Sequence, residues 1–301
     1  MSHSSFSYLA ITLTLECLLT WIMTTGYVFE EIYLWHDSGS LRYQRDFVEP
    51  MEAWEHPDTK RRLHSLLSIT GMLDHVRRIP ARSATDEEIL QFHTKDYLDR
   101  VRQESGLRGG DGGDMCQFGH GSFEIAKLSA GGVLAGIEAI VSGEIKNCYA
   151  LVRPPGHHAC ASQGMGFCIF NNIVIGAMRA KKLGFNRIAI VDYDVHHGNG
   201  TQEAFWNDSD VLFISVHQDS NYPLRSGYAH ERGGPDAIDA TINIPLPPGS
   251  GVGAYSYAFE RVVIPALNRF RPDLILVSSG FDASYADPLG IDQFFRNKYN
   301  E

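Results

Sequence analysis

The sequence predicts an α/β protein, in which a mainly parallel central sheet is flanked by helices and carries a candidate active site at the carboxyl ends of its strands. Four continuous apolar runs, at residues 148–152, 188–191, 211–216 and 274–279, alternate with stretches of helical character. Such uninterrupted apolar strands are typical of parallel sheets that are buried on both faces. Polar segments follow each run (RPPGHH, DYDVHH, HQDSNYP and GFDASYADP). Because ligands of open parallel sheets bind at the carboxyl ends of the strands, we expect these segments to converge.

The remaining elements are predicted from periodicity and end signals. Residues 85–101 begin with Thr85 and acidic residues, which is typical of a helix start. The glycine-rich residues 105–121 predict a surface loop, and residues 122–144 have helical periodicity. A further helix is expected over 171–184, with Asn171 or Asn172 as its N-cap and a glycine after its last turn.

Composition restricts the class of protein. Of 301 residues, 44% are hydrophobic and 21% are charged, which is ordinary for a soluble globular chain. The net charge of -10 argues against direct nucleic-acid binding and favours cationic substrates. The five cysteines contain no Cys-x-x-Cys pair, so we expect reduced thiols and a cytoplasmic location.

The chain is divided into residues 1–23, 24–290 and 291–301. Residues 6–23 are largely apolar but contain Glu16, and the chain has no Lys or Arg before Arg42, so they match neither a signal peptide nor a stable membrane span. A membrane-associated leader and a packed extra helix remain alternatives. We favour a non-native or misassigned start, because Met23 offers a start directly before TTGYVF.

The segment Asp194-Val195-His196 is the first indication of a metal site. Alternate residues of an extended chain face the same way, so the carboxylate and the imidazole can reach one cation. Asp282, which follows the last apolar run, completes two carboxylates and one imidazole. This set matches a catalytic zinc site with three protein ligands and an open position. A single Asp-x-His is more often a strand end with solvated polar residues. This explanation is disfavoured only when Asp282 and a second histidine pair are included.

That second pair is His157 and His158, in the segment Pro154-Pro155-Gly156-His157-His158. Histidine moves protons near neutral pH, so two histidines beside a metal-activated water can share the roles of base and acid. By itself the pair could equally be two surface histidines on a loop. Asp192 lies one step deeper than Asp194 and is expected to orient a histidine or to bind a monovalent cation.

At this point the sequence resembles the zinc-dependent histone deacetylase superfamily. The resemblance rests on RPPGHHA, GFCIFNN, VDYDVHHGNGTQ, SVHQ and SSGFDASYADPLG, and TGYVFEEIYLWHD resembles the start of the family. The variant resembles the class II branch and its bacterial relatives, which include acetylpolyamine amidohydrolases. The resemblance implies an arginase/deacetylase-like fold and one zinc ion held by Asp194, His196 and Asp282. It further implies that His157 and His158 act on the water and the leaving amine, backed by Asp192 and Asn199 respectively.

The resemblance also implies a substrate tunnel and a cation site. Phe167 and Tyr222 resemble the aromatic pair that lines the narrow tunnel, and Gly166 resembles the small residue near its floor. Taken alone, the two aromatics are more typical of core or surface residues. An acidic residue at the tunnel rim is expected to be Asp111 or Asp114. A structural potassium ion is implied at Asp192 and Ser215, with backbone oxygens of Asp194, His196 and Val216.

The sequence departs from the family after Gly290. The family carries a Gly-Gly-Tyr segment whose phenol stabilises the oxyanion, and this chain contains no Gly-Gly-Tyr. Tyr299 lacks the preceding glycines and is not assigned that role. We therefore interpret the chain as a truncated, frameshifted or fragmentary member, and we predict a metal site with weak or absent turnover.

Three functions are weighed against each other. The first is a zinc amide hydrolase acting on acetyl-lysine in proteins or on acetylpolyamines, and the sequence does not choose between these substrates or settle whether the protein is a homo-oligomer. The second is an arginase-like binuclear manganese ureohydrolase. Gly198 disfavours it, because this glycine stands where that family's Asp-x-His-x-Asp pattern needs a second carboxylate. The third is a homologue that binds acylated ligands without turning them over.

Overall fold

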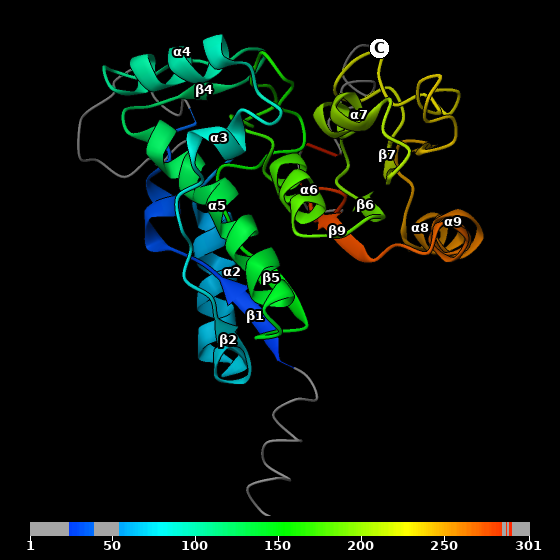
Figure 1. The fold of residues 1–301 in the computed structure, drawn as a ribbon, viewed down its shortest axis with the longest axis horizontal. Coiled ribbons are helices and arrows are strands. Elements are labelled where there is room, and N and C mark those ends of the chain that lie inside the picture. Colours follow the sequence, from blue (N-terminus) through cyan, green and yellow to red (C-terminus); the bar gives the residue numbers. More distant parts are fainter. Residues whose placement is uncertain (1–23, 39–53, 285–286, 288, 291–301) are drawn as a thin grey trace, which may run out of the picture.

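The computed structural model describes residues 24–38, 54–284, 287 and 289–290. The predicted extension 1–23 and the predicted tail 291–301, with Tyr299, lie outside the described residues. The predicted α/β class is confirmed: helices flank two parallel sheets (Figure 1). Among the described helices, none is long and apolar enough to cross a membrane.

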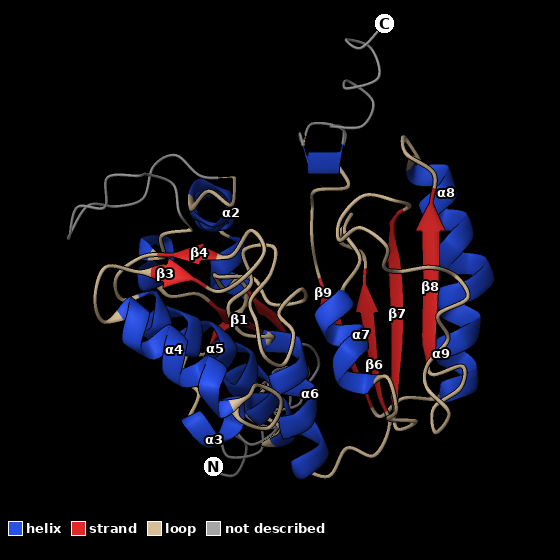
Figure 2. Ribbon diagram, turned by 90° about the horizontal axis from the view of Figure 1, so that it is seen from above, coloured by secondary structure: helices blue, strands red, loops and turns tan. Residues whose placement is uncertain are grey.

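The larger sheet has the strand order β8-β7-β6-β9, and all its pairs are parallel. Its strands are β6 (Ile188–Asp192), β7 (Val211–Gln218), β8 (Thr241–Leu246) and β9 (Leu274–Ser278). The helices around it are α6 (Asn172–Lys182), α7 (Asn199–Phe205), α8 (Val252–Ala258) and α9 (Ile264–Phe270), with the π-helical segment η3 (Phe259–Val263) between the last two. The arrowheads of β6 and β8 point to one side of the sheet, as its parallel order requires (Figure 2).

Alternation along the strands separates two apolar layers. Ile188 and Ile190 pack with α6 and α7 on one face, while Ala189 and Val191 pack with α8 and α9 on the other. This double burial explains why the strands read as continuous apolar runs. At β9 the second layer is incomplete, because Ile275 and Val277 are 48% and 47% exposed.

The smaller sheet has the order β2-β1-β5 and is also parallel. Its strands are β1 (Thr25–Val28), β2 (Arg77–Arg78) and β5 (Asn147–Ala150). The long helix α5 (Ser122–Val141) contacts β1 and β5. Leucines of α2 (Asp58–Ile69) pack against a cluster that contains Tyr27 and Phe29. The short elements η1 (Glu31–Trp35) and η2 (Met72–His75) complete this part.

The structure refines several predicted elements. The run at 148–152 forms β5 beside β1, whereas the other three runs lie in the larger sheet. Residues 85–101 form two helices, α3 (Asp86–Ile89) and α4 (Lys95–Ser105), because the Thr94 amide bonds the Ala161 carbonyl and its side chain caps α4. The predicted loop 105–121 contains a small hairpin of β3 (Gly110–Asp111) and β4 (Gln117–Phe118). Asn171 is the N-cap of α6, as one of the two predicted alternatives.

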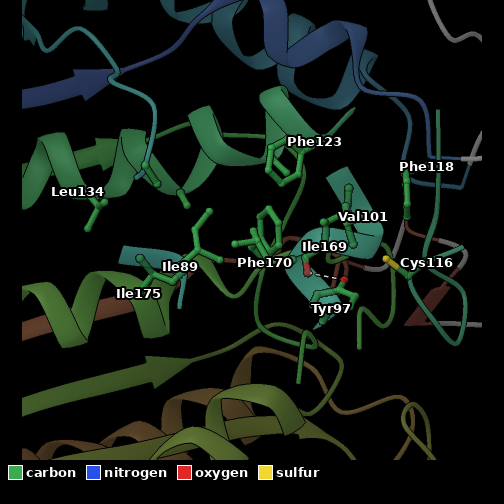
Figure 3. Close-up of a cluster of buried hydrophobic side chains, with 14 residues drawn as sticks. Ile89, Tyr97, Val101, Cys116, Phe118, Phe123, Leu134, Ile169, Phe170 and Ile175 are labelled. Carbon is green, nitrogen blue, oxygen red and sulfur yellow. Dashed lines mark hydrogen bonds between the residues drawn. The ribbon is translucent and has the colours of Figure 1, made fainter. Parts of the chain in front are cut away.

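A second core lies where α3, α4 and α5 meet the segment before α6 (Figure 3). Ile169 and Phe170 are fully buried there, and the Tyr97 hydroxyl donates to the Ile169 carbonyl at 2.8 Å. Phe123 contacts Phe170 edge to face. This packing holds the segment that leads from the histidine pair into α6.

Candidate metal centre

Three side chains from two strand ends meet at one point. Asp194 and His196 follow β6, Asp282 follows β9, and one ligand atom of each lies within 4.8 Å of the others. His196 Nδ1 is 3.0 Å from Asp194 Oδ1 and 2.9 Å from Asp282 Oδ2. The predicted convergence of these residues is therefore present in the structure.

Backbone contacts hold the three side chains in this arrangement. The His196 amide donates to Asp194 Oδ1, and the Val195 amide donates to Asp282 Oδ1, each at 2.9 Å. A β-carbon at Gly280 would lie 2.1 Å from Asp194 Oδ2, so the chain leaving β9 can pass the carboxylate only with glycine there. The glycine of the segment GFD thus permits Asp282 to approach Asp194.

The electrostatics of this cluster favour a cation. Burial and the neighbouring Asp194 raise the pKa of Asp282 to about 6, because two carboxylates share a confined space. Burial would lower the pKa of His196, but its hydrogen bonds to Asp194 and Asp282 outweigh this and raise it to about 10. The two carboxylates thus favour a positive charge at this point, and two carboxylates with one imidazole form a donor set that suits zinc.

The histidine pair lies beside this cluster, and the rings of His157 and His158 have centroids 3.9 Å apart. His157 Nδ1 is 2.9 Å from Asp192 Oδ2, and Asp192 is fully buried. Burial would lower the pKa of His157, but the carboxylates of Asp192 and Asp194 raise it to about 9. Asp192 occupies the position expected of a group that backs His157.

His158 differs from its neighbour in its partner and in its charge. Its Nδ1 is 2.8 Å from the amide oxygen of Asn199, so it donates there and leaves Nε2 as an acceptor. The Asn199 amide nitrogen donates to the His158 carbonyl at 3.2 Å, which supports this orientation of the amide. Burial and the adjacent His157 lower the pKa of His158 well below its usual value. The pair therefore combines a neutral imidazole with a protonated one.

Tyr222 and Gly166 flank the pair. The Tyr222 ring meets His158 and His196 edge to face, with centroid distances of 5.1 and 6.0 Å. Gly166 has a φ of +51°, and a β-carbon there would lie 2.3 Å from the His158 ring. Phe167 follows with a φ of +67°, and its pairing with Tyr222 across a tunnel stays a prediction.

The two candidate rim acids lie in different surroundings. Asp114 accepts a hydrogen bond from the Tyr222 hydroxyl at 3.2 Å on Oδ2. Asp111 instead accepts the Gly113 amide in a local turn. Only Asp114 of the two has a contact with an aromatic side chain of the site.

The two side chains of the predicted potassium site lie on neighbouring strands, Asp192 on β6 and Ser215 on β7. Asp192 faces Ser215 in the register of β6 and β7, and both side chains are fully buried. The Ser215 hydroxyl is 2.9 Å from His217 Nδ1. The potassium site stays a prediction.

Two buried polar groups near the site were not identified from the sequence. Arg153, which opens the histidine loop, is fully buried and pairs with Glu55 at 2.6 Å. Farther along, His197 and His217 have ring centroids 4.8 Å apart and contact the loop that follows β7. No local pattern joins Arg153 to Glu55, because these two residues lie 98 positions apart in the chain.

Comparisons of the sequence and of the fold with known proteins identify relatives of this chain. Residues 53–301 match the histone deacetylase domain family. The chain is 43% identical over 282 residues to a histone deacetylase-like amidohydrolase of Pseudomonas aeruginosa, covering 91% of this chain and 74% of that protein. It is 38% identical over 272 residues to a probable deacetylase of Archaeoglobus fulgidus, covering 89% and 71%. The crystal structure of the HDA15 HD domain is similar with a TM-score of 0.82 and 36% identity, covering 89% and 75%.

Proposed function

This chain belongs to the histone deacetylase family and is a hydrolase of the deacetylase type, and we propose that it uses zinc to remove acetyl groups from N-acetylated amines. Acetyl-lysine in proteins and acetylpolyamines are the two substrate classes. The observation that carries the proposal is the meeting of Asp194, His196 and Asp282 beside a histidine pair. The net charge of -10 supports a cationic substrate.

Asp194, His196 and Asp282 would hold the zinc ion in this proposal. Bound zinc acts as a Lewis acid toward the acetyl carbonyl and lowers the pKa of a water molecule. Asp192 supports the set from behind, because one of its oxygens accepts the Asp194 amide at 3.1 Å while the other faces His157. Such outer contacts orient ligands and their neighbours.

The histidine pair would move the protons. His158 is neutral with its proton on Nδ1, so Nε2 is the base that takes a proton from the attacking water. His157 is held protonated by Asp192 and stabilises negative charge that develops on the substrate. After His158 has taken its proton, the pair supplies one to the leaving amine and acetate is released.

We also propose the predicted potassium ion between β6 and β7. Asp192 and Ser215 would contribute side-chain oxygens, and Asp194, His196 and Val216 would contribute carbonyl oxygens. The facing positions of Asp192 and Ser215, both buried, support it. We expect the midpoint of thermal unfolding to rise in KCl but not in choline chloride of the same concentration.

Turnover by residues 1–301 is proposed to be slow, because these residues contain no Gly-Gly-Tyr. The loss of one oxyanion donor costs about 10²–10³ in kcat. The same observation favours the second candidate, a homologue that binds acylated ligands without turning them over. An arginase-like site has weaker support, because the metal-ligand group among the described residues holds three members.

The test is an assay of acetate release from an acetyl-lysine peptide and from N-acetylputrescine, with the zinc-loaded chain. We expect slow turnover that disappears in H158A and D282N. Tight hydroxamate binding without any release would favour the second candidate. Hydrolysis of arginine with manganese, and none of either acetylated substrate, would contradict the proposal.

A further inference from the structure

We propose that the hydrogen bond between Tyr222 and Asp114 is a clasp that orients the Asp114 carboxylate toward the substrate, which makes Tyr222 a positioning residue. The inference rests on the proposed function, since the donors that Asp114 would meet belong to the acetylated substrate. A tunnel wall needs only the aromatic ring of Tyr222. Its hydroxyl, however, donates to Asp114 Oδ2 at 3.2 Å and lies 3.4 Å from the Asp114 carbonyl oxygen.

On one side, a short ladder of backbone hydrogen bonds fixes Asp114. The Gly164, Gly166 and Phe167 amides donate to the carbonyls of residues 112, 114 and 115, at 2.8 to 2.9 Å. Met115, Gly166 and Phe167 all have positive φ in this ladder. The rim loop is therefore tied to the segment that packs against His158, and Asp114 cannot swing away freely.

On the other side, buried polar groups fix the loop that carries Tyr222. His197 Nδ1 is 2.7 Å from the Ser226 hydroxyl, and His217 Nε2 is 2.9 Å from the Gly227 carbonyl oxygen. Glu231 accepts the Gly227 amide at 3.0 Å and the Gln202 side chain at 2.8 Å. Gly227 has a φ of +81°, and a β-carbon there would lie 2.4 Å from the His217 ring. The loop is thus held close above the two histidines.

The clasp joins these two anchored segments across the edge of the site. The Tyr222 proton occupies Asp114 Oδ2 and leaves Oδ1 for donors of a ligand. Without the phenol, the exposed carboxylate can rotate, and a substrate must order it on binding. Tyr222 therefore removes part of the entropic cost of binding a substrate that carries N–H donors beyond its acetyl group.

A pair of probes isolates this contribution. The first is a fluorescent acetyl-lysine tripeptide with backbone amides, and the second is N-acetylbutylamine, which carries the acetyl group without them. Affinities are measured by anisotropy and by competition on the zinc-loaded chain. In both Y222F and D114N, we expect the preference for the peptide over N-acetylbutylamine to fall roughly fivefold, the size of one partly exposed hydrogen bond. The control Y228F removes an outlying phenol and is expected to keep the wild-type preference.

The double variant Y222F/D114N decides whether the two residues act together. Because the clasp assigns both effects to one hydrogen bond, the double variant is expected to equal D114N alone. An unchanged peptide preference in Y222F, or a further fivefold loss in the double variant, would overturn the clasp. In kinetic assays, the loss of kcat/KM should come from a higher KM and not from a lower kcat.

Hydrogen–deuterium exchange tests the clasp without any ligand. Y222F and D114N are expected to speed exchange of the Gly166 and Phe167 amides, whose acceptors lie in the rim loop, while Y228F does not. A wild-type chain that binds neither probe contradicts the proposed function, but faster exchange would still support the clasp. Unchanged exchange in both variants would overturn the clasp even if deacetylation is observed.

Discussion

Replacement of Arg153 by methionine tests the buried ion pair that anchors the histidine loop. The Arg153 side chain is fully buried, and Nε contacts the Glu55 carboxylate at 2.6 Å. Its guanidinium also donates to the carbonyls of Tyr33, His36 and Glu55. Burial alone would raise the pKa of Glu55, but Arg153 and Lys60 hold it below its usual value, so the carboxylate stays charged.

The expected loss follows from what R153M leaves behind. Removal of one partner from a buried ion pair costs about 3–5 kcal/mol, because the other charge loses its compensation. Lys60 still reaches Glu55 at 3.1 Å, which places the loss at the lower end, about 3 kcal/mol. With a urea m-value of about 3 kcal/mol/M for a domain of this size, the midpoint falls by about 1 M.

Urea unfolding followed by tryptophan fluorescence measures this change. The matched control is R77M, because Arg77 pairs with Glu144 at 2.6 Å but its side chain is 56% exposed, and such pairs contribute at most about 1 kcal/mol. The double variant E55Q/R153M should recover part of the loss, since it removes the stranded charge. An R153M midpoint equal to that of R77M would show that the buried ion pair stabilises the fold no more than an exposed one.

Three further predictions follow from single residues. N199D places a carboxylate beside His158 Nδ1 and should raise the pKa of His158. Because His158 must be neutral to act as a base, the acid limb of the kcat/KM profile should move up by about one to three pH units. An acid limb that does not move would contradict the assignment of His158 as the base. G131A puts a β-carbon 1.6 Å from a backbone carbonyl oxygen and should cost about 1–3 kcal/mol, whereas G253A meets nothing within 4 Å and should leave the thermal transition unchanged or higher. Burial and the nearby Arg153 lower the pKa of His36 to about 3. Below pH 6.5 the unfolded chain takes up a proton at His36 but the folded chain does not, so the free energy of unfolding should be about 2 kcal/mol lower at pH 5 than above pH 6.5. H36N should weaken this pH dependence.

The meeting of Asp194, His196 and Asp282 was predictable because it follows from local rules. A continuous apolar run identifies β6, and the Asp-x-His spacing after it places Asp194 and His196 together. Parallel strand ends share an edge, so Asp282 after β9 could be added from a segment far along the chain. By the same reasoning, His157 and His158 were expected beside them, and they do lie there, although the strand before them, β5, belongs to the smaller sheet.

Other features depend on tertiary contacts that leave no local pattern. The glycine-rich loop has no periodicity, so neither its backbone ladder to residues 164–167 nor the contact between Asp114 and Tyr222 could be read from the sequence. The division of residues 85–101 into α3 and α4 depends on a hydrogen bond from Thr94 to Ala161. The strands β1 and β8 were not predicted as such, since TGYV is short and TINIPL contains a proline.

Metal stoichiometry distinguishes a zinc centre at Asp194, His196 and Asp282 from a binuclear manganese centre. The chain is stripped with a chelator, incubated with zinc and manganese in equal amounts, dialysed and analysed by mass spectrometry for bound metal. We expect one zinc ion per chain for the wild type and for D287N, and none for D194N or D282N. Two manganese ions per chain, or a full zinc content in D282N, would contradict this expectation.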